Sequence, residues 1–246
     1  MDTGDAMKTL TVILARAGSK GLVGKNSLTV AGRPMLAWTI EHALGSRRVG
    51  RVILSTDGEH LAEVARSMGV EVVPRSVETA NDSATVDSAT RHAVLTVEKK
   101  TDEPFDAVAI LYGNIPVRPA DLTDRAVAKL DETGCDSVQS VYPIEKLHPY
   151  WMKRLGGRDG DELLMYEPND VYRRQDLPPV YMLNGGVIAV TRKSLFNVDP
   201  DHPHAFLGEE RRAIVNDPED VIDIDSRLDL RVAEAVLLER RKSSVA

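Results

Sequence analysis

The stretch that most constrains this chain is Lys8–Asn26, where an apolar segment changes abruptly into a loop rich in glycine and cations. Leu10–Leu14 is an apolar, β-branched run that predicts a buried strand. The glycines after it let backbone N–H groups approach a ligand closely, and the cations neutralise that ligand. Many α/β proteins hold a triphosphate or pyrophosphate in this way, although a plain structural turn has the same composition. The loop matches neither GxxxxGK[ST] nor GxGxxG.

Composition narrows the classes of protein that remain. The chain has 246 residues, 42% hydrophobic and 28% charged, which is typical of one globular domain able to bury a full core. A net charge of −7 without a basic tract argues against a nucleic-acid partner. No apolar run reaches the roughly 20 residues that span a bilayer, and Met1–Met7 lacks the features of a signal peptide. We therefore expect no membrane partner and a cytoplasmic protein, in agreement with the single Cys135.

Strand and helix patterns alternate through the first half of the chain. Apolar β-branched runs predict strands, and apolar residues three to four positions apart predict the helices between them. The predicted strands are Leu10–Leu14, Arg51–Ser55, Glu71–Val73, Ala107–Leu111, Ser137–Val141 and Tyr181–Val190, and helices begin at Pro34, Glu59, Asp82 or Ser83, Pro119 and Ser226. This alternation predicts an α/β fold, with a mainly parallel sheet and helices on both faces.

The regular alternation stops at Pro143. Pro143–Pro179 is rich in aromatic and charged side chains and lacks periodicity, which favours a β-rich arm that serves as a subunit interface or substrate lid. A mere surface excursion is the alternative. Lys193–Ala213 is predicted to be mostly irregular. In the last helix Ser226 and Asp229 form a predicted capping box, and the predicted buried stripe is Leu228, Val232, Ala235 and Val236.

Two acidic features are candidates for chemistry. Asp223 and Asp225 point the same way in an extended segment, with Ile224 facing the core. Paired carboxylates without histidine or cysteine suit Mg²⁺, which takes carboxylate and phosphate oxygens. The alternative is that Asp225 only starts the helix and Asp223 is solvated. Asp57 follows a predicted strand and lies either at the ligand edge of the sheet or at the cap of the next helix.

A cationic glycine loop and a distant aspartate pair are what nucleotidyl transfer requires. Transfer at phosphorus depends mainly on positioning and on neutralising charge. Cations hold the phosphates, and a metal ion bridges carboxylate and phosphate oxygens. The sequence therefore predicts a nucleotidyltransferase.

The motifs then resemble the acylneuraminate cytidylyltransferases, also called CMP-sialic acid synthetases. Ala15–Asn26, ARAGSKGLVGKN, is similar to the family's P-A-R-G-G-S-K-G-I-P-G-K-N loop. The likeness continues over roughly residues 8–240, and its other motifs are Leu54–Asp57, Arg75, Asn81–Ala84, Tyr181–Gly186 and Val221–Asp229.

This resemblance implies a single Rossmann-like nucleotidyltransferase domain over residues 1–246, with a dimerisation arm at about 143–180. It implies transfer of CMP from CTP to the anomeric hydroxyl of a sialic-acid-like nonulosonic acid, with release of pyrophosphate. The implied cofactor is Mg²⁺, with Mn²⁺ as a substitute, and the implied assembly is a homodimer or homotetramer.

The resemblance also assigns site residues by position. Those for the CTP phosphates and base are Arg16, Ser19, Lys25, Asn26, Asp82 and Asn114. Asp223 and Asp225 are assigned to the metal and, with Arg16 and Lys25, to catalysis. Those for the sugar acid are Arg118, Lys146, His148, Arg174, Gln175 and Asn184, and Lys146 or His148 is a candidate to reach a neighbouring subunit's site.

The loop Leu111–Arg118 departs from the family's L-Q-P-T-S-P-L-R pattern. Residues 113–116, GNIP, lean toward the G-D-E-P of the related 3-deoxy-manno-octulosonate cytidylyltransferases, with Asn114 in place of a metal-binding aspartate. An amide is a poorer Mg²⁺ ligand than a carboxylate. Another sugar acid, another nucleoside triphosphate, or a catalytically weak nucleotide-binding homologue are therefore competing interpretations.

Overall fold

Helices and strands alternate along the chain as the sequence predicts. The computed structural model describes residues 7–18, 22, 24–75 and 85–243. The helices are α1 (Met35–Leu44), α2 (Glu59–Ser67), α4 (Val86–Thr101), α5 (Leu122–Thr133), α6 (Arg192–Leu195) and α7 (Arg227–Ser243). The strands are β1 (Thr9–Leu14), β2 (Thr29–Val30), β3 (Arg33–Pro34), β4 (Arg51–Thr56), β5 (Glu71–Pro74), β6 (Ala107–Tyr112), β7 (Ser137–Ile144), β8 (Lys153–Gly156), β9 (Glu162–Met165), β10 (Val180–Thr191) and β11 (Arg211–Val215). The predicted helix start at Asp82 or Ser83 lies outside the described residues.

The centre of the molecule is a seven-stranded sheet in the order β11-β7-β10-β6-β1-β4-β5. β1 pairs in parallel with β4 and β6, β4 with β5, and β7 with β11. β10 runs antiparallel to its neighbours β6 and β7. β1 is buried along its whole length, because its β-branched and apolar side chains pack against both helical layers. The predicted α/β fold with a mainly parallel sheet is confirmed.

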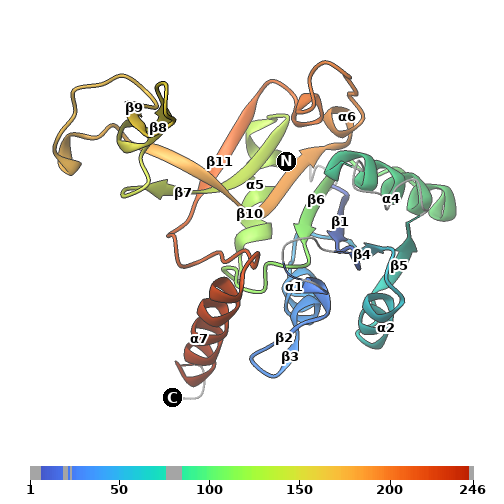
Figure 1. Ribbon diagram of the computed structural model, residues 1–246. Helices are drawn as coiled ribbons and strands as arrows, with labels where there is room; N and C mark the ends of the chain where they lie inside the picture. Colours follow the sequence, from blue (N-terminus) through green and yellow to red (C-terminus); the bar gives the residue numbers. More distant parts are fainter. Residues whose placement is uncertain (1–6, 19–21, 23, 76–84, 244–246) are drawn as a thin grey trace.

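Helices cover both faces of this sheet (Figure 1). Apolar side chains of α1, α2 and α5 pack on one face, and those of α4 pack on the other. The connection through α1 leads from β1 to β4 on one side, whereas the connection through α4 leads to β6 on the other side of β1. The strand order therefore reverses between β1 and β6. Open α/β sheets bind ligands outside the carboxyl ends of the strands at such a point.

A small lobe projects from the sheet, where β7 and β10 extend outward and carry the hairpin of β8 and β9 (Figure 1). This lobe, residues 143–180, is the β-rich arm that the sequence predicts. Leu155 and Leu163 are cross-strand partners in the hairpin, yet they are 69% and 71% exposed. The arm thus presents apolar side chains that this single chain does not cover, and its role as a subunit interface remains a prediction.

One strand of the seven-stranded sheet was not predicted from the sequence. β11 forms the edge of the sheet, and it begins within the last three residues of the segment predicted to be mostly irregular, Lys193–Ala213. Its residues Arg211, Arg212 and Ala213 are exposed, and Ile214 is buried. Because an edge strand of this kind buries so few side chains, it lacks the apolar alternation by which strands are usually detected.

The last helix forms where predicted, but its buried face differs from the prediction. Ser226 and Asp229 make the predicted capping box, in which the Ser226 N–H donates to Asp229 Oδ2 at 2.7 Å and the Asp229 N–H donates to Ser226 Oγ at 3.3 Å. The predicted stripe is wrong at Leu228 and Val232, which are 67% and 45% exposed, and at Ala235, which is also exposed. Ala233 and Leu237 are buried instead, beside the β2–β3 hairpin. No helix within the described ranges has the length and apolarity needed to cross a bilayer.

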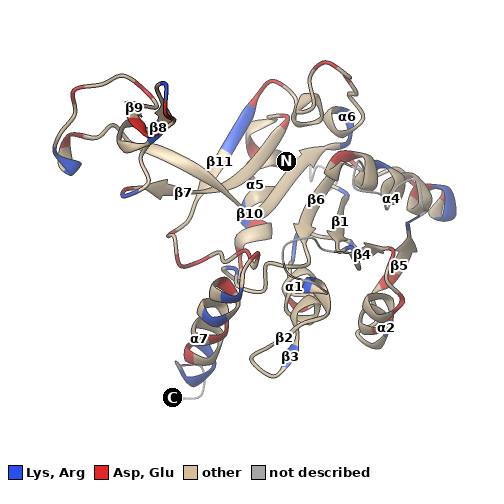
Figure 2. Ribbon diagram, viewed as in Figure 1, with Lys and Arg blue, Asp and Glu red and all other residues tan. Residues whose placement is uncertain are grey.

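Charge is also ordered along this C-terminal part of the chain. Figure 2 shows acidic residues gathered in the segment that leads into α7 and basic residues at the far end of the helix. Acidic groups near a helix start and basic groups near its end both complement the helix dipole. The segment that carries Asp223 and Asp225 leads directly into α7 and lies beside the sheet.

Candidate active site

The site lies where two loops leave the carboxyl ends of β1 and β6. The loop after β6 approaches the loop after β1 closely, and the Gly113 N–H donates to the carbonyl oxygen of Leu14 at 3.0 Å. A Cβ atom at Gly113 would lie 2.8 Å from the Cβ of Ala15, so a side chain at this position would push the loops apart. The strand order reverses at this same position. The fold therefore brings the two loops that the sequence marks as candidates to one edge of the sheet.

The central feature of the site is an ion pair between residues 200 positions apart. Lys25 Nζ lies 2.6 Å from Asp225 Oδ1. The lysine follows β1 in a short 3₁₀ helix, and the aspartate precedes α7. The early cationic loop and the late aspartate pair thus meet, as the sequence predicts.

The aspartate segment is anchored by its backbone. The Ile224 N–H donates to the carbonyl oxygen of Asn114 at 3.1 Å, and Ile222 bridges to Val117. Ile224 is completely buried, as predicted, whereas Asp223 and Asp225 on either side of it are exposed. Two carboxylates are therefore presented together by a segment that the core fixes in place.

Asn114 links the altered loop to the aspartate pair, because its Nδ2 donates to Asp223 Oδ1. Desolvation, with a smaller contribution from the neighbouring Asp225 carboxylate, raises the pKa of Asp223 to about 6. The positive charges of Lys25 and Arg118 act against this rise. The two carboxylates therefore repel each other in the absence of a cation, and a bound cation would relieve that repulsion.

Two side chains hold the cationic loop by hydrogen bonds to one peptide group, the one between Arg16 and Ala17. Asn26 Nδ2 donates to the carbonyl oxygen of Arg16 at 2.8 Å, and the Ala17 N–H donates to Asp57 Oδ1 at 2.7 Å. Asn26 is buried, so the structure shows it ordering the loop, and its assigned contact with CTP remains a prediction. Ser19 and Asp82, also assigned to the nucleotide, lie outside the described residues.

Asp57 and Arg75 are functional candidates to which the sequence reasoning gave no definite role. Asp57 does not cap α2, whose N-cap is Gly58 without a side-chain bond. Arg75 follows β5 at the same edge, and its Nε donates to Ser55 Oγ at 3.0 Å. Burial lowers the pKa of Arg75, Asp57 acts against that shift, and the nearby Arg16 adds to it. The feature of the sequence that could have identified both residues is their position, since each directly follows a parallel strand.

Arg118 requires a correction, because its guanidinium is buried inside the loop after β6. It donates to the carbonyl oxygens of Gly186 at 2.7 Å, Tyr112 at 2.9 Å and Ile115, and to Thr39 Oγ1 at 3.0 Å. Burial lowers the pKa of this guanidinium to about 9. With its donors directed at the protein, Arg118 shapes the loop from within, and the predicted direct contact with the sugar acid does not fit this geometry.

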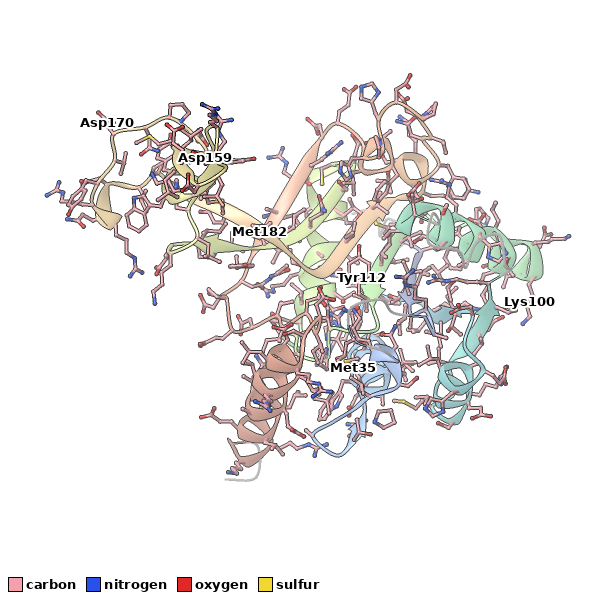
Figure 3. The ribbon with its side chains drawn as sticks, in the orientation of Figure 1. Met35, Lys100, Tyr112, Asp159, Asp170 and Met182 are labelled. Carbon is pink, nitrogen blue, oxygen red and sulfur yellow. The ribbon has the colours of Figure 1, made fainter. Side chains whose placement is uncertain are left out.

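Asn184 remains a candidate for the sugar acid. Its Oδ1 accepts from Ser140 Oγ at 2.5 Å and from the Gly186 N–H at 3.1 Å. Its Nδ2 is buried without a hydrogen-bond partner among the described residues. Tyr112 lies at the end of β6 next to this strand (Figure 3), and a Cβ atom at Gly185 would lie 3.3 Å from the Cδ2 of its ring. β10 therefore brings an unpaired amide donor to the site edge.

The arm residues are not brought to the aspartate pair within one chain. His148 is buried and holds the arm together, with Nε2 3.0 Å from the carbonyl oxygen of Pro178 and Nδ1 accepting from the Tyr150 N–H. This bonding does not fit the prediction that His148 binds the sugar acid or reaches a neighbouring subunit's site. Arg174 pairs with Glu145, and Lys146 and Gln175 are exposed. Figure 3 shows the arm, in which Asp159 and Asp170 are labelled, set apart from Tyr112 at the end of β6.

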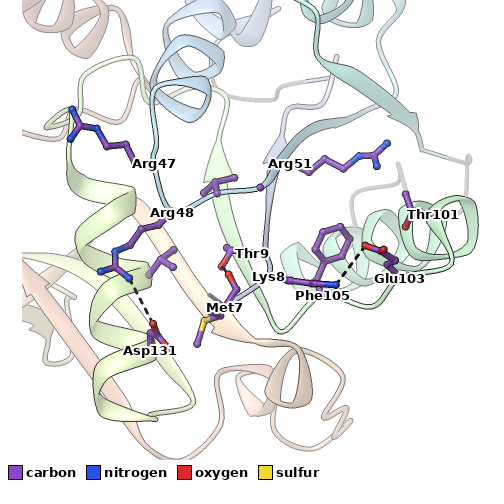
Figure 4. A pocket seen from close by; sticks show the side chains of 13 residues that line it. Met7, Lys8, Thr9, Arg47, Arg48, Arg51, Thr101, Glu103, Phe105 and Asp131 are labelled. Carbon is purple, nitrogen blue, oxygen red and sulfur yellow. Dashed lines mark hydrogen bonds and ion pairs between the residues drawn. The ribbon is translucent and has the colours of Figure 1, made fainter. Parts of the chain in front are cut away.

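A hollow lies at the opposite end of the sheet from this site, at the amino-terminal ends of the strands. It has a volume of about 610 Å³, and Phe105, Arg48 and Lys8 are among its lining residues (Figure 4). Its charges are largely matched, because Arg48 lies 3.7 Å from Asp131 and Lys8 lies 3.7 Å from Glu103. Neither the strand polarity nor the charge balance favours this hollow as the reaction site.

Solved structures share the fold. The chain aligns with CMP:2-keto-3-deoxy-manno-octonic acid synthetase, solved in complex with CTP, with a TM-score of 0.69, 19% identity, and coverage of 95% of this chain and 99% of that one. It also aligns with 4-diphosphocytidyl-2C-methyl-D-erythritol synthase from Anaerococcus prevotii, with a TM-score of 0.64, 15% identity, and coverage of 95% and 100%. The chain therefore has the Rossmann-like fold of these nucleotidyltransferases.

Sequence relatives give the narrower class. A cytidylyltransferase family model matches residues 10–199. CMP-N,N'-diacetyllegionaminic acid synthase from Legionella pneumophila is 31% identical over 94% of this chain and 97% of its own length. N-acylneuraminate cytidylyltransferase from Escherichia coli is 28% identical, over 97% of this chain but 54% of its own length. Pseudaminic acid cytidylyltransferase from Campylobacter jejuni is 25% identical over 97% and 100%. The chain belongs to the cytidylyltransferase family.

Proposed function

We propose that this cytidylyltransferase transfers CMP from CTP to the anomeric hydroxyl of a sialic-acid-like nonulosonic acid and releases pyrophosphate. The relatives named above act on acids of this class, and the resemblance of residues 15–26 to the acylneuraminate loop supports the same assignment. The observation that carries the proposal is the ion pair of Lys25 with Asp225, which joins the phosphate-type loop to the paired carboxylates.

The site residues suit attack on the α-phosphorus of CTP. Arg16 and Lys25 would neutralise the triphosphate as negative charge moves onto the leaving pyrophosphate. Asn26 and Asp57 would fix the loop that carries these cations, because both bond to the Arg16–Ala17 peptide group. Asn184, with its unpaired Nδ2, would donate to the sugar acid at the neighbouring strand. In this scheme positioning and charge neutralisation supply most of the rate enhancement.

The aspartate pair fits a hard divalent cation, Mg²⁺ or in its place Mn²⁺. Asp223 and Asp225 offer exposed carboxylate oxygens, and their mutual repulsion favours a cation between them. Across the described ranges no three His, Cys, Asp or Glu residues gather as a metal cluster. Mg²⁺ is commonly held by one or two carboxylates together with substrate phosphates and water. When bound, such an ion would neutralise phosphate oxygens and polarise the phosphorus under attack.

We also propose that two or more copies assemble through the arm, as a homodimer or homotetramer. Exposed apolar and aromatic side chains, including Tyr172 at 92% exposure, support an interface on this lobe. In such an assembly Lys146, Arg174 and Gln175 would be carried toward the active site of the other copy. The proposed location of the enzyme is the cytoplasm.

A second sugar acid is favoured by one observation. The residues 113–116, GNIP, lean toward the pattern of 3-deoxy-manno-octulosonate cytidylyltransferases, and the Asn114 side chain contacts Asp223 directly. Asn114 lies next to the proposed metal site, where it would influence how the sugar acid is oriented. An acid of this eight-carbon type is therefore the alternative substrate.

One panel experiment tests these assignments. The protein is incubated with Mg²⁺, one of CTP, UTP, GTP or ATP, and one of N-acetylneuraminic, diacetyllegionaminic, pseudaminic or 3-deoxy-manno-octulosonic acid, and pyrophosphate is assayed. We expect release with CTP and at least one of the first three acids. Release with the eight-carbon acid alone would favour the alternative. Silence across the panel with folded protein, or release with GTP alone, would contradict the proposal.

A further inference from the structure

The peptide group between Arg16 and Ala17 is held at both of its polar atoms. Its carbonyl oxygen accepts from Asn26 Nδ2 at 2.8 Å, and its N–H donates to Asp57 Oδ1 at 2.7 Å. The two side chains come from different parts of the fold, since Asn26 lies later in the same loop and Asp57 follows β4. A peptide plane fixed at both ends cannot rotate, so the direction in which the loop leaves β1 is set.

Packing reinforces this arrangement from the side of β4. The Ala15 N–H donates to the carbonyl oxygen of Ser55 at 3.2 Å, which extends the β1–β4 pairing to the end of both strands. A Cβ atom at Gly58 would lie 2.9 Å from the Cβ of Ala17. The segment that follows β4 is therefore in direct contact with the start of the cationic loop.

Asp57 is also an acidic neighbour of Arg75. The electrostatic influence of both Asp57 and Arg16 reaches Arg75, which follows β5 on the same edge. The carboxylate opposes the burial-driven fall in the pKa of Arg75, whereas Arg16 adds to that fall. The Asp57 carboxylate therefore opposes part of the cost of burying the Arg75 guanidinium at this edge of the sheet.

We propose that Asp57 is a positioning residue for the nucleotide: by holding the Ala17 N–H it orients the cationic loop before CTP binds. This inference rests on the proposed function, because it assumes that the loop receives CTP. The essential interaction is the hydrogen bond to the Ala17 amide, and an uncharged oxygen acceptor at position 57 would preserve it. In this role Asp57 would act through the loop and would contact neither the triphosphate nor the metal.

Two substitutions separate this role from others. Asp57→Ala removes the acceptor, and Asp57→Asn keeps an oxygen that accepts the same N–H. Asp124 supplies a matched control, because its carboxylate accepts from the backbone N–H groups of Arg47 and Arg48 at the opposite end of the sheet. Asp124→Ala therefore breaks the same type of bond without changing the candidate site.

The first measurement is amide hydrogen exchange of Ala17 in the protein without nucleotide. We expect roughly tenfold or faster exchange in Asp57→Ala, and exchange close to that of the unmodified protein in Asp57→Asn and Asp124→Ala. The second is the Kd for CTP in the presence of Mg²⁺, by calorimetry. We expect about a tenfold rise in Asp57→Ala and less than about a threefold change in the other two variants.

Each outcome has a definite meaning. Unchanged exchange of Ala17 in Asp57→Ala would overturn the inference, and so would an Asp57→Asn variant that binds CTP as weakly as Asp57→Ala. If the unmodified protein did not bind CTP, the proposed function would fail, and the exchange data would still show whether Asp57 holds the loop. If it bound CTP and Asp57→Ala bound equally well, the positioning role alone would be rejected.

Discussion

At the scale of single residues, the site is built from buried polar groups that shape loops and exposed charged groups that face a ligand. Arg118 belongs to the first group and Asp225 to the second, since Asp225 is 72% exposed in its side chain and pairs with a lysine. Substitutions of the two kinds of residue should have different effects. Loss of a buried group leaves its partners unpaired and lowers stability, whereas loss of an exposed group changes binding.

Arg118→Ala tests this division. The substitution removes the hydrogen bonds that the buried guanidinium donates to the carbonyl oxygens of Gly186, Tyr112 and Ile115, so we expect the free energy of unfolding to fall by about 3 kcal/mol or more. Urea unfolding measures the loss, and Arg154→Ala, on the exposed hairpin, is the control with little expected change. A stable Arg118→Ala protein with a raised KM for the sugar acid would show instead that Arg118 contacts substrate.

Asn114→Asp tests the residue that distinguishes this loop. The new carboxylate would lie against Asp223, and three acidic groups attract a divalent cation more strongly than two. We expect the Mg²⁺ concentration for half-saturation, measured by calorimetry with CTP present, to fall by roughly fivefold to tenfold. An unchanged or higher requirement would place the metal away from Asn114.

At the scale of secondary-structure elements, the contact between α1 and α5 contains a histidine that folding keeps neutral. His42 Nε2 lies 2.8 Å from Thr123 Oγ1, and burial lowers the pKa of His42 to about 3. The positive charge of Arg118 lowers this pKa further, and Asp124 opposes the shift. The unfolded chain therefore binds a proton that the folded protein excludes, over the interval between pH 6.5 and about 3.

Stability should accordingly fall as the pH is lowered through this interval. Above pH 6.5 the histidine is neutral in both states, so its full contribution to stability is present. Between pH 7.5 and pH 5 it should reduce the free energy of unfolding by roughly 2 kcal/mol. His42→Gln should remove that part of the pH dependence, as measured by urea unfolding at several pH values. An identical pH dependence in the variant would show that folding does not lower the pKa of His42.

The elements also show how much the sequence could predict. The strands of the parallel half were predictable because they are buried on both faces and therefore read as continuous apolar runs. The helix at residues 227–243 was predictable, but its buried side was not: Leu228 and Val232 are as apolar as Leu237, and only the position of the β2–β3 hairpin decides which side is covered. β11 was not predicted because its exposed arginines interrupt the apolar pattern by which a strand is recognised.

The site was predictable in the same uneven way. The charges of Lys25 and Asp225 marked the two segments that meet, because opposite charges beside strand ends have a physical reason to converge. The inward turn of Arg118 was not predictable, since an arginine in a loop is usually solvated. The roles of Asp57 and His148 depend on backbone partners that no pattern along the chain reveals.

At the scale of the whole molecule, the arm predicts association of copies. Leu155 and Leu163 face each other across the hairpin and stay exposed, so burial against a second copy would remove apolar surface from water. We expect the protein to be a dimer or tetramer by light scattering, and Leu163→Asp to yield smaller species at micromolar concentration. Leu44→Asp, at an exposed leucine on α1, should leave the assembly unchanged. A monomeric unmodified protein, or equal effects of both variants, would contradict the arm interface.

The molecule as a whole is organised so that two segments of opposite charge act as one site, and a double-mutant cycle tests this most directly. The kcat/KM for CTP is measured for Lys25→Met, Asp225→Asn and the protein that carries both changes, with the sugar acid that gives the fastest pyrophosphate release. We predict that each single change lowers kcat/KM by about 100-fold, and that the double variant is close to the worse single one. Losses that simply multiply, or a single variant with full activity, would contradict a common site.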